Sequence, residues 1–140
     1  MVIATELIKK TYIYFIKYEN NSPLAVSIKN DCKEYVKNHV HKDILDIIED
    51  TVSNYYNIPI KVLQLKSKKR EIVQTRQIEM YFAIKYTKIP STQIGIRFGN
   101  KEHATVLHAV KVINNLIDTD IEVRNDIRNL RILIEDLITI

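Results

Sequence analysis

The segment GNKEHATVLHAV, residues 99–110, carries the residue types best suited to recognition chemistry in this chain. Gly99 precedes a polar, charge-mixed tetrad at 100–103, after which apolar residues recur at helical spacing from Val106. Ammonium, carboxylate and imidazole groups gathered at a helix start can donate and accept several hydrogen bonds. The tetrad is therefore either an ordinary solvated helix start or an edge that touches a ligand.

A second candidate is the basic stretch from Lys61 to Arg76. It holds six basic residues against one acid, Glu71, a local charge of +5 in a chain whose formal net charge is +4. The remainder of the chain therefore sums to −1. This concentration indicates contact with a polyanion, and a solvated linker is the alternative that charge alone leaves open.

Other reactive side chains give weaker patterns. His39 and His41 lie two residues apart without a Cys or a further cluster, so a surface helix end is expected rather than a metal site. Cys32 lies on an apolar stripe without a base partner, which favours core packing over nucleophilic chemistry. Four acids are expected to face solvent from an amphipathic helix rather than form a carboxylate site: Asp43, Asp46, Glu49 and Asp50. The sequence thus predicts no catalytic residue, metal or cofactor.

Composition limits the fold that must position these residues. The chain has 140 residues, of which 46% are hydrophobic, and only two glycines and three prolines. An all-α fold is expected, because an all-β fold would need more turn residues. The single cysteine, the amphipathic N-terminus and the absence of an apolar run of about 18 residues predict a soluble, cytoplasmic protein.

Hydrophobic periodicity divides the chain into helices. Helices are predicted over 3–19, 24–39, 43–56, 75–87, 101–117 and 119–138, with a short helix or turn at 58–66 and a basic loop at 67–74. A two-turn helix is expected to begin with Ser91 as its N-cap and to end at Gly99 in the left-handed conformation. Asn100 is expected to cap the next helix. A short helix, a glycine turn and a longer helix form the helix-turn-helix pattern.

A family resemblance adds to this interpretation. Residues 75–113, TRQIEMYFAIKYTKIPSTQIGIRFGNKEHATVLHAVKVI, resemble the C-terminal DNA-binding domain of the bacterial replication initiator DnaA. The family pattern I-G-x-x-F-G-G-R-D-H-T-T-V-x-H-A corresponds here to I-G-I-R-F-G-N-K-E-H-A-T-V-L-H-A. The resemblance implies an all-α, Trp-repressor-like bundle over 41–140. Residues 1–40 are expected to form two extra helices for docking or dimerisation.

In that family, the second helix of the motif enters the major groove of double-stranded DNA and a basic loop enters the minor groove. The resemblance then implies base contacts from Lys101, Glu102, His103, Ala104 and Thr105. It implies minor-groove contacts from Lys68, Lys69 and Arg70, with the choice between Lys68 and Arg70 left open because the loop is about two residues shorter than usual. It implies phosphate contacts from Arg76, Gln77, Thr92 and Asn100, with Arg76 and Gln77 opening a helix.

Three departures from the family pattern bear on specificity. The family usually has Arg, Asp and Thr where this chain has Lys101, Glu102 and Ala104. Loss of a hydroxyl at Ala104 leaves a methyl group that can touch thymine. The preferred DNA sequence is therefore expected to differ from that of the family.

The expected function is sequence-specific binding of double-stranded DNA by a replication-linked, origin-binding or regulatory factor associated with the nucleoid. No phosphate loop of the G-x-x-x-x-G-K-[ST] form is present, so no nucleotide and no enzyme activity are expected. A homodimer or a protein partner is expected through residues 1–40 or the C-terminal helix. The competing hypothesis is a helical interaction module that keeps the fold but has lost DNA binding.

Overall fold

The computed structural model describes residues 2–18, 22–39 and 43–138, and in these ranges its secondary structure consists of helices without a strand. They are α1 (Val2–Lys17), α2 (Pro23–His39), α3 (Ile44–Tyr56), α4 (Ile60–Leu63), α5 (Arg70–Tyr86), α6 (Ser91–Arg97), α7 (His103–Thr119) and α8 (Ile121–Ile138). The all-α fold predicted from the sequence is confirmed.

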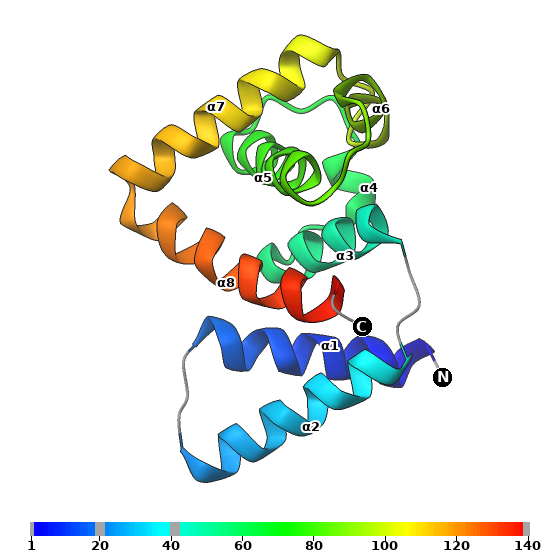
Figure 1. The fold of residues 1–140 in the computed structure, drawn as a ribbon, viewed down its shortest axis with the longest axis vertical. Helices are drawn as coiled ribbons and strands as arrows, with labels where there is room; N and C mark the ends of the chain where they lie inside the picture. Colours follow the sequence, from blue (N-terminus) through cyan, green and yellow to red (C-terminus); the bar gives the residue numbers. More distant parts are fainter. Residues whose placement is uncertain (1, 19–21, 40–42, 139–140) are drawn as a thin grey trace.

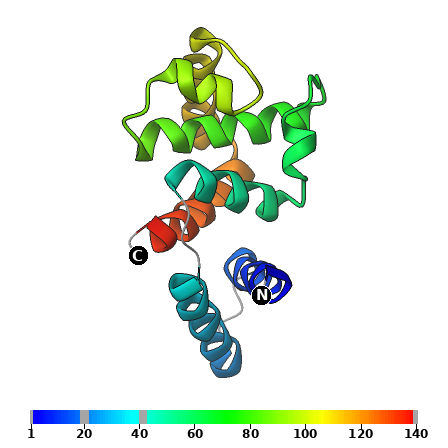
Figure 2. The same ribbon diagram turned by 90° about the vertical axis from the view of Figure 1, so that its right-hand side faces the viewer.

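Helix α5 lies at the centre of a bundle formed by α3 to α8 and contacts α3, α4, α6 and α7 (Figure 1). Helices α1 and α2 form a hairpin that lies below α3 and α8, away from α6 and the start of α7 (Figures 1 and 2). The segment between α4 and α5 runs along the edge of the bundle (Figure 2). The helix-turn-helix and the N-terminal hairpin therefore occupy opposite ends of the molecule.

The core forms where the apolar stripes of α3, α5, α7 and α8 meet. Fully buried side chains come from each of these helices, from α6 and from the turn after it: Ile48, Val52, Tyr55, Ile78, Phe82, Ile94, Phe98, Val106, Ile113, Leu130 and Ile134. Fully burying one such side chain stabilises the fold by about 1.5 to 3 kcal/mol. The amphipathic spacing of the sequence is thus sufficient to account for the bundle.

Helix α1 is held to the bundle by both apolar and polar contacts. Tyr12 and Ile13 are buried, and the Tyr12 hydroxyl donates to Asp136 Oδ2 of α8 at 2.6 Å. Burial, reinforced by the carboxylate of Asp136, raises the pKa of Tyr12. At the other end of α1, Lys17 Nζ donates to the Tyr55 carbonyl at 2.9 Å. The N-terminal hairpin is therefore packed against α3 and α8.

Helix α3 begins and ends much as its sequence predicts, but its acidic face is not fully solvated. Asp43 Oδ1 accepts from the Asp46 amide at 2.9 Å as an N-cap, and Asn57 ends the helix with φ of 54°. Glu49, however, is buried and lies 3.3 Å from Arg97 Nη2. The prediction that all four acids face solvent is therefore wrong for Glu49, because α6 brings a basic partner over that face.

Three other local predictions are also corrected. Helix α5 begins at Arg70 rather than at residue 75, so the basic loop is confined to 64–69. Helix α7 begins at His103, with Glu102 rather than Asn100 at the N-cap position and no side-chain hydrogen bond at the cap. Ser91 is the first residue of α6 instead of its N-cap, because Pro90 already occupies that position.

Candidate nucleic-acid interface

The turn between α6 and α7 depends on two glycines. Gly99 has φ of +101°, as the sequence predicted, and Asn100 follows with φ of 53°. The Lys101 amide donates to the Gly95 carbonyl at 2.7 Å. A Cβ atom on Gly95 would lie only 2.1 Å from the Lys101 carbonyl oxygen, so no side chain fits between the turn and α6. The close approach fixes the start of α7 against α6.

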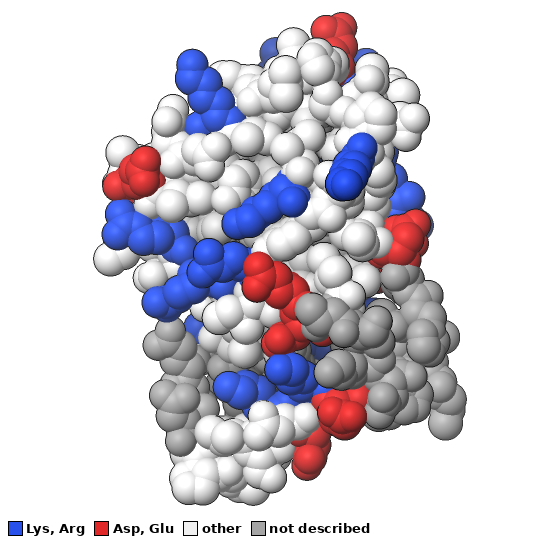
Figure 3. Space-filling model, in the orientation of Figure 1, with Lys and Arg blue, Asp and Glu red and all other residues white. Residues whose placement is uncertain are grey.

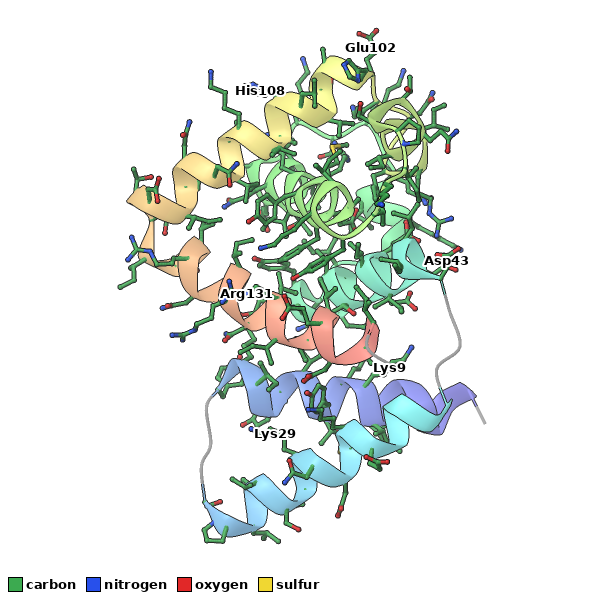
Figure 4. The ribbon with its side chains drawn as sticks, in the orientation of Figure 1. Lys9, Lys29, Asp43, Glu102, His108 and Arg131 are labelled. Carbon is green, nitrogen blue, oxygen red and sulfur yellow. The ribbon has the colours of Figure 1, made fainter. Side chains whose placement is uncertain are left out.

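The start of α7 is an exposed polar edge. Glu102, His103, Ala104 and Thr105 are all exposed, and Lys101 is half-buried. Glu102 points away from the bundle at the outer end of α7, and His108 extends from the outward side of the same helix (Figure 4). The structure thus brings together the five residues predicted to contact bases. Their contacts with DNA stay a prediction.

His103 has a partner that sequence reasoning missed. Ser91 Oγ, on the first residue of α6, is hydrogen-bonded to His103 Nδ1, on the first residue of α7. The two residues are 12 positions apart, so helical periodicity gives no signal for the contact. The neighbouring Thr92, predicted to contact phosphate, is exposed beside this pair. The two helices of the motif therefore meet at a predicted base-contacting side chain.

Arg76 does not lie where the sequence prediction requires. It is 4% exposed and sits in the second turn of α5, so the prediction that it opens a helix is wrong. Its Nε donates to the Leu63 carbonyl at 2.9 Å and its Nη2 to the Leu65 carbonyl at 2.7 Å. Burial lowers the pKa of Arg76, and nearby Glu79 opposes this shift. Arg76 therefore holds the backbone at the start of the basic loop, and its contact with a phosphate stays a prediction.

The remaining basic residues of this region are exposed, and two of them line a groove. Lys61, Lys66, Lys68, Lys69 and Arg70 are all exposed. The groove, of about 340 Å³, lies between the start of α5 and the middle of α7, and its lining residues are Lys68, Arg70, Val73, Gln74, Gln77, Val112 and Leu116. Lys68, Arg70 and Gln77, which the sequence assigned to DNA contacts, thus share one surface hollow. Gln77 lies well inside α5 rather than at its start.

Charge elsewhere is more evenly distributed. On the face seen in Figure 3, Lys and Arg side chains are dispersed among Asp and Glu side chains. The basic segment at 61–70 remains the densest concentration of exposed positive charge in the sequence.

A partly buried cluster of charged groups lies where α6 packs against α3 and α5. Arg97 of α6 pairs with Asp46 and with Glu49, while Glu79 of α5 is 2% exposed. Burial, together with the charge of Glu49, raises the pKa of Glu79 well above its usual range, which favours the neutral acid. Among the described residues, Glu79 Oε1 finds no hydrogen-bond partner. Sequence periodicity does not predict this cluster, since its members come from three helices.

Reactive chemistry finds little support in the described part of the chain. No group of three or more His, Cys, Asp or Glu side chains there is placed to hold a metal ion. The side chain of His39 and the whole of His41 lie outside the described residues. Cys32 is half-buried, and burial raises the pKa of its thiol. That environment is typical of a packed cysteine rather than a nucleophile.

The sequence of this region matches a family. The model for the bacterial DnaA protein helix-turn-helix covers residues 45–113, from the first turn of α3 into α7. This segment is a DnaA-type helix-turn-helix domain. The resemblance stated from the sequence is therefore confirmed. The DnaA-type domain is a DNA-binding domain without catalytic activity, and the match does not include an ATPase domain.

Individual relatives give the same result. The chain is 44% identical over 92 residues to the chromosomal replication initiator protein DnaA of Flavobacterium psychrophilum, covering 66% of this chain and 19% of that protein. It is 33% identical over 117 residues to the DnaA protein of Enterococcus faecalis, covering 82% of this chain and 26% of that protein. Because 82% of the chain is aligned, this second match includes part of residues 1–40.

The chain spans about a fifth to a quarter of the length of these DnaA relatives. No solved structure matches it. In the ranges that the structure describes, none of the helices combines the length and the apolar character needed to cross a bilayer.

Proposed function

We propose that the chain binds double-stranded DNA sequence-specifically, with the start of α7 in the major groove and the basic loop in the adjacent minor groove. The observation that carries the proposal is the exposed edge Lys101–Thr105 at the start of the second helix of a DnaA-type motif. A helix-turn-helix reads bases with this end of its second helix. The edge keeps donors and acceptors outside the core, where base edges can meet them.

The basic loop supports the second half of the proposal. Lys68 and Arg70 line a groove that leads from the loop to the middle of α7, together with Gln77. A DNA strand whose major groove holds α7 and whose adjacent minor groove holds the basic loop would run along such a protein surface. Lys69 is exposed on the same loop but does not line the groove. Lys68 and Arg70 are thus the better placed for the minor groove, and Gln77, Thr92 and Asn100 for phosphates.

The biological setting follows from the relatives and is likewise proposed. The proteins that match are chromosomal replication initiators, so a replication-linked or regulatory site on DNA is the expected target. We place the protein on the nucleoid for that reason. A protein partner or a second copy would meet α2 or the outer side of α8, because α1 already packs against α3 and α8.

Selection from a random duplex pool, followed by fluorescence anisotropy over a range of salt concentrations, tests the proposal. One sequence class should be enriched, and log K should fall with log salt at a slope of about −2.7 to −4.5 if three to five phosphates are neutralised. Arg70→Ala should weaken binding and reduce the slope, while Arg131→Ala, an exposed arginine on α8, is the matched control. Failure to enrich any sequence, with His103→Ala and Arg70→Ala equal to wild type, would leave the helical interaction module as the function.

A further inference from the structure

The contact between Ser91 and His103 determines which ring nitrogen of the histidine faces outward. Ser91 Oγ is hydrogen-bonded to Nδ1, the ring nitrogen nearer to the backbone, and the His103 side chain is otherwise exposed. The remaining nitrogen, Nε2, is therefore the one available to a ligand. The pair is held in place because the Lys101 amide bonds to Gly95 and draws the start of α7 against α6.

A neutral imidazole has one donor and one acceptor nitrogen, so the partner of Nδ1 decides the role of Nε2. If serine donates to Nδ1, Nε2 carries the proton and acts as a donor. If Nδ1 donates to serine, Nε2 becomes an acceptor. The two arrangements would read opposite features of a base pair.

The position of His103 favours the first arrangement. It is the first residue of α7, the end of the helix that has free backbone amides and the positive end of the dipole. A positive environment stabilises a lone pair on the near nitrogen and opposes a proton there. The neutral form with its proton on Nε2 is therefore the tautomer that suits the site.

We propose that Ser91 is a positioning residue that donates to His103 Nδ1 and so makes His103 a donor toward DNA. Resting on the proposed function, this assigns His103 to a base acceptor in the major groove: a purine N7, a guanine O6 or a thymine O4. Cytosine offers only an amino donor there, so it is disfavoured at that position. Ser91 thus influences specificity without touching the base.

Two measurements test the assignment. Nitrogen-15 NMR of the ring in the DNA-free protein should show His103 Nδ1 unprotonated and Nε2 protonated in wild type, and a mixture of the two neutral forms in Ser91→Ala. At the base position whose preference is lost in His103→Ala, Ser91→Ala should reduce the preference for an acceptor base by about 3- to 10-fold, the effect of one hydrogen bond. Ser91→Thr should restore it, and the salt slope should not change.

Ser27→Ala is the matched control, because it removes the hydroxyl of an exposed serine on α2. It should leave both readouts unchanged. A protonated Nδ1 in wild type, or an unchanged tautomer and base preference in Ser91→Ala, would overturn the proposal. Because the NMR readout needs no DNA, it is separate from the proposed function. If wild type enriches no sequence, the function fails, while the ring spectrum still decides whether Ser91 sets the tautomer.

Discussion

Gly99 leaves the space that the side chain of Arg76 occupies. A Cβ atom on Gly99 would lie 3.1 Å from Arg76 Nε and 3.2 Å from Arg76 Cδ. The same guanidinium donates to the carbonyls of Leu63, the last residue of α4, and Leu65, in the basic loop. One buried side chain therefore touches both the turn of the motif and the base of the loop. The position of the loop relative to α7 is set within the protein before any DNA is bound.

The glycines of the motif should not tolerate even a methyl group. Gly99→Ala places an L side chain at φ of +101° beside Arg76 and should lower the free energy of unfolding by about 1 to 3 kcal/mol. Gly95→Ala should cost at least as much, since its Cβ meets a backbone oxygen. Urea denaturation measures both. Asn100→Gly, at the other left-handed position, should stay within about 0.5 kcal/mol of wild type, and a fully stable Gly95→Ala would refute the packing described.

Arg76→Lys separates a structural role from a phosphate contact. Lysine keeps the charge but cannot reach both carbonyls with a planar fork, so stability should fall by about 2 to 3 kcal/mol. The salt slope of DNA binding should change by much less than one unit. Lys68→Ala should do the reverse, with stability unchanged and a slope reduced by about 0.9. If Arg76→Lys is as stable as wild type and its salt slope is reduced, Arg76 contacts a phosphate and does not have the structural role.

Glu79 should make the fold less stable as pH rises. Its folded-state pKa is raised by burial and by Glu49, so between its unfolded pKa of about 4.3 and the raised value the folded state binds more protons. Stability is therefore fullest below that window and falls through it. Glu79→Gln should flatten this part of the curve without abolishing it, because burial also raises the pKa of Glu49. Urea midpoints from pH 4 to 8, on the order of one measurement per pH unit, would show whether the two curves converge toward low pH.

The altered residues of the recognition edge should change the DNA sequence and not the fold. Ala104 and Glu102 are exposed, so Ala104→Thr and Glu102→Asp should alter stability by less than about 0.5 kcal/mol. Each should shift the sequence selected from a random pool at one or two positions, by about 1 to 3 kcal/mol of discrimination per contact. If wild type and both variants select the same sequences, Ala104 and Glu102 do not contact the bases.

The hydroxyl of Tyr12 should contribute to the packing of α1. Tyr12→Phe removes the 2.6 Å bond to Asp136 and leaves that half-buried carboxylate with one partner fewer, so stability should fall by about 1 kcal/mol. Tyr18→Phe changes an exposed tyrosine directly after α1; it is the control and should have almost no effect. Equal thermal midpoints for the two variants would show that the hairpin contributes little to the stability of the bundle.

The features that could be predicted from the sequence are those that depend on residues close together in the chain. Gly99 in the left-handed region, the apolar stripe of α8 and the extent of α3 each follow from a few adjacent residues. The start of α5 was missed because residues 67–74 are mostly charged or polar, which conceals the helical period there. The exposed edge at the start of α7 could be predicted, because residues that avoid the core leave a gap in the apolar pattern.

Contacts between helices escaped prediction. Arg76 and Glu49 carry charges that suggest solvent, yet both are buried because a partner from another helix or loop covers them. Likewise, Ser91 and His103 meet only once the turn has folded. A single sequence contains no signal for such pairs, since each depends on the path of the backbone between them.

The N-terminal hairpin has a practical consequence for the proposed complex. Helix α2 lies at the end of the molecule farthest from the start of α7 (Figure 1). A dye, a surface tether or a fused protein attached to its outer side would stand clear of a duplex held at the opposite end. The molecule can therefore be immobilised through the outer side of α2 while the start of α7 stays accessible to DNA.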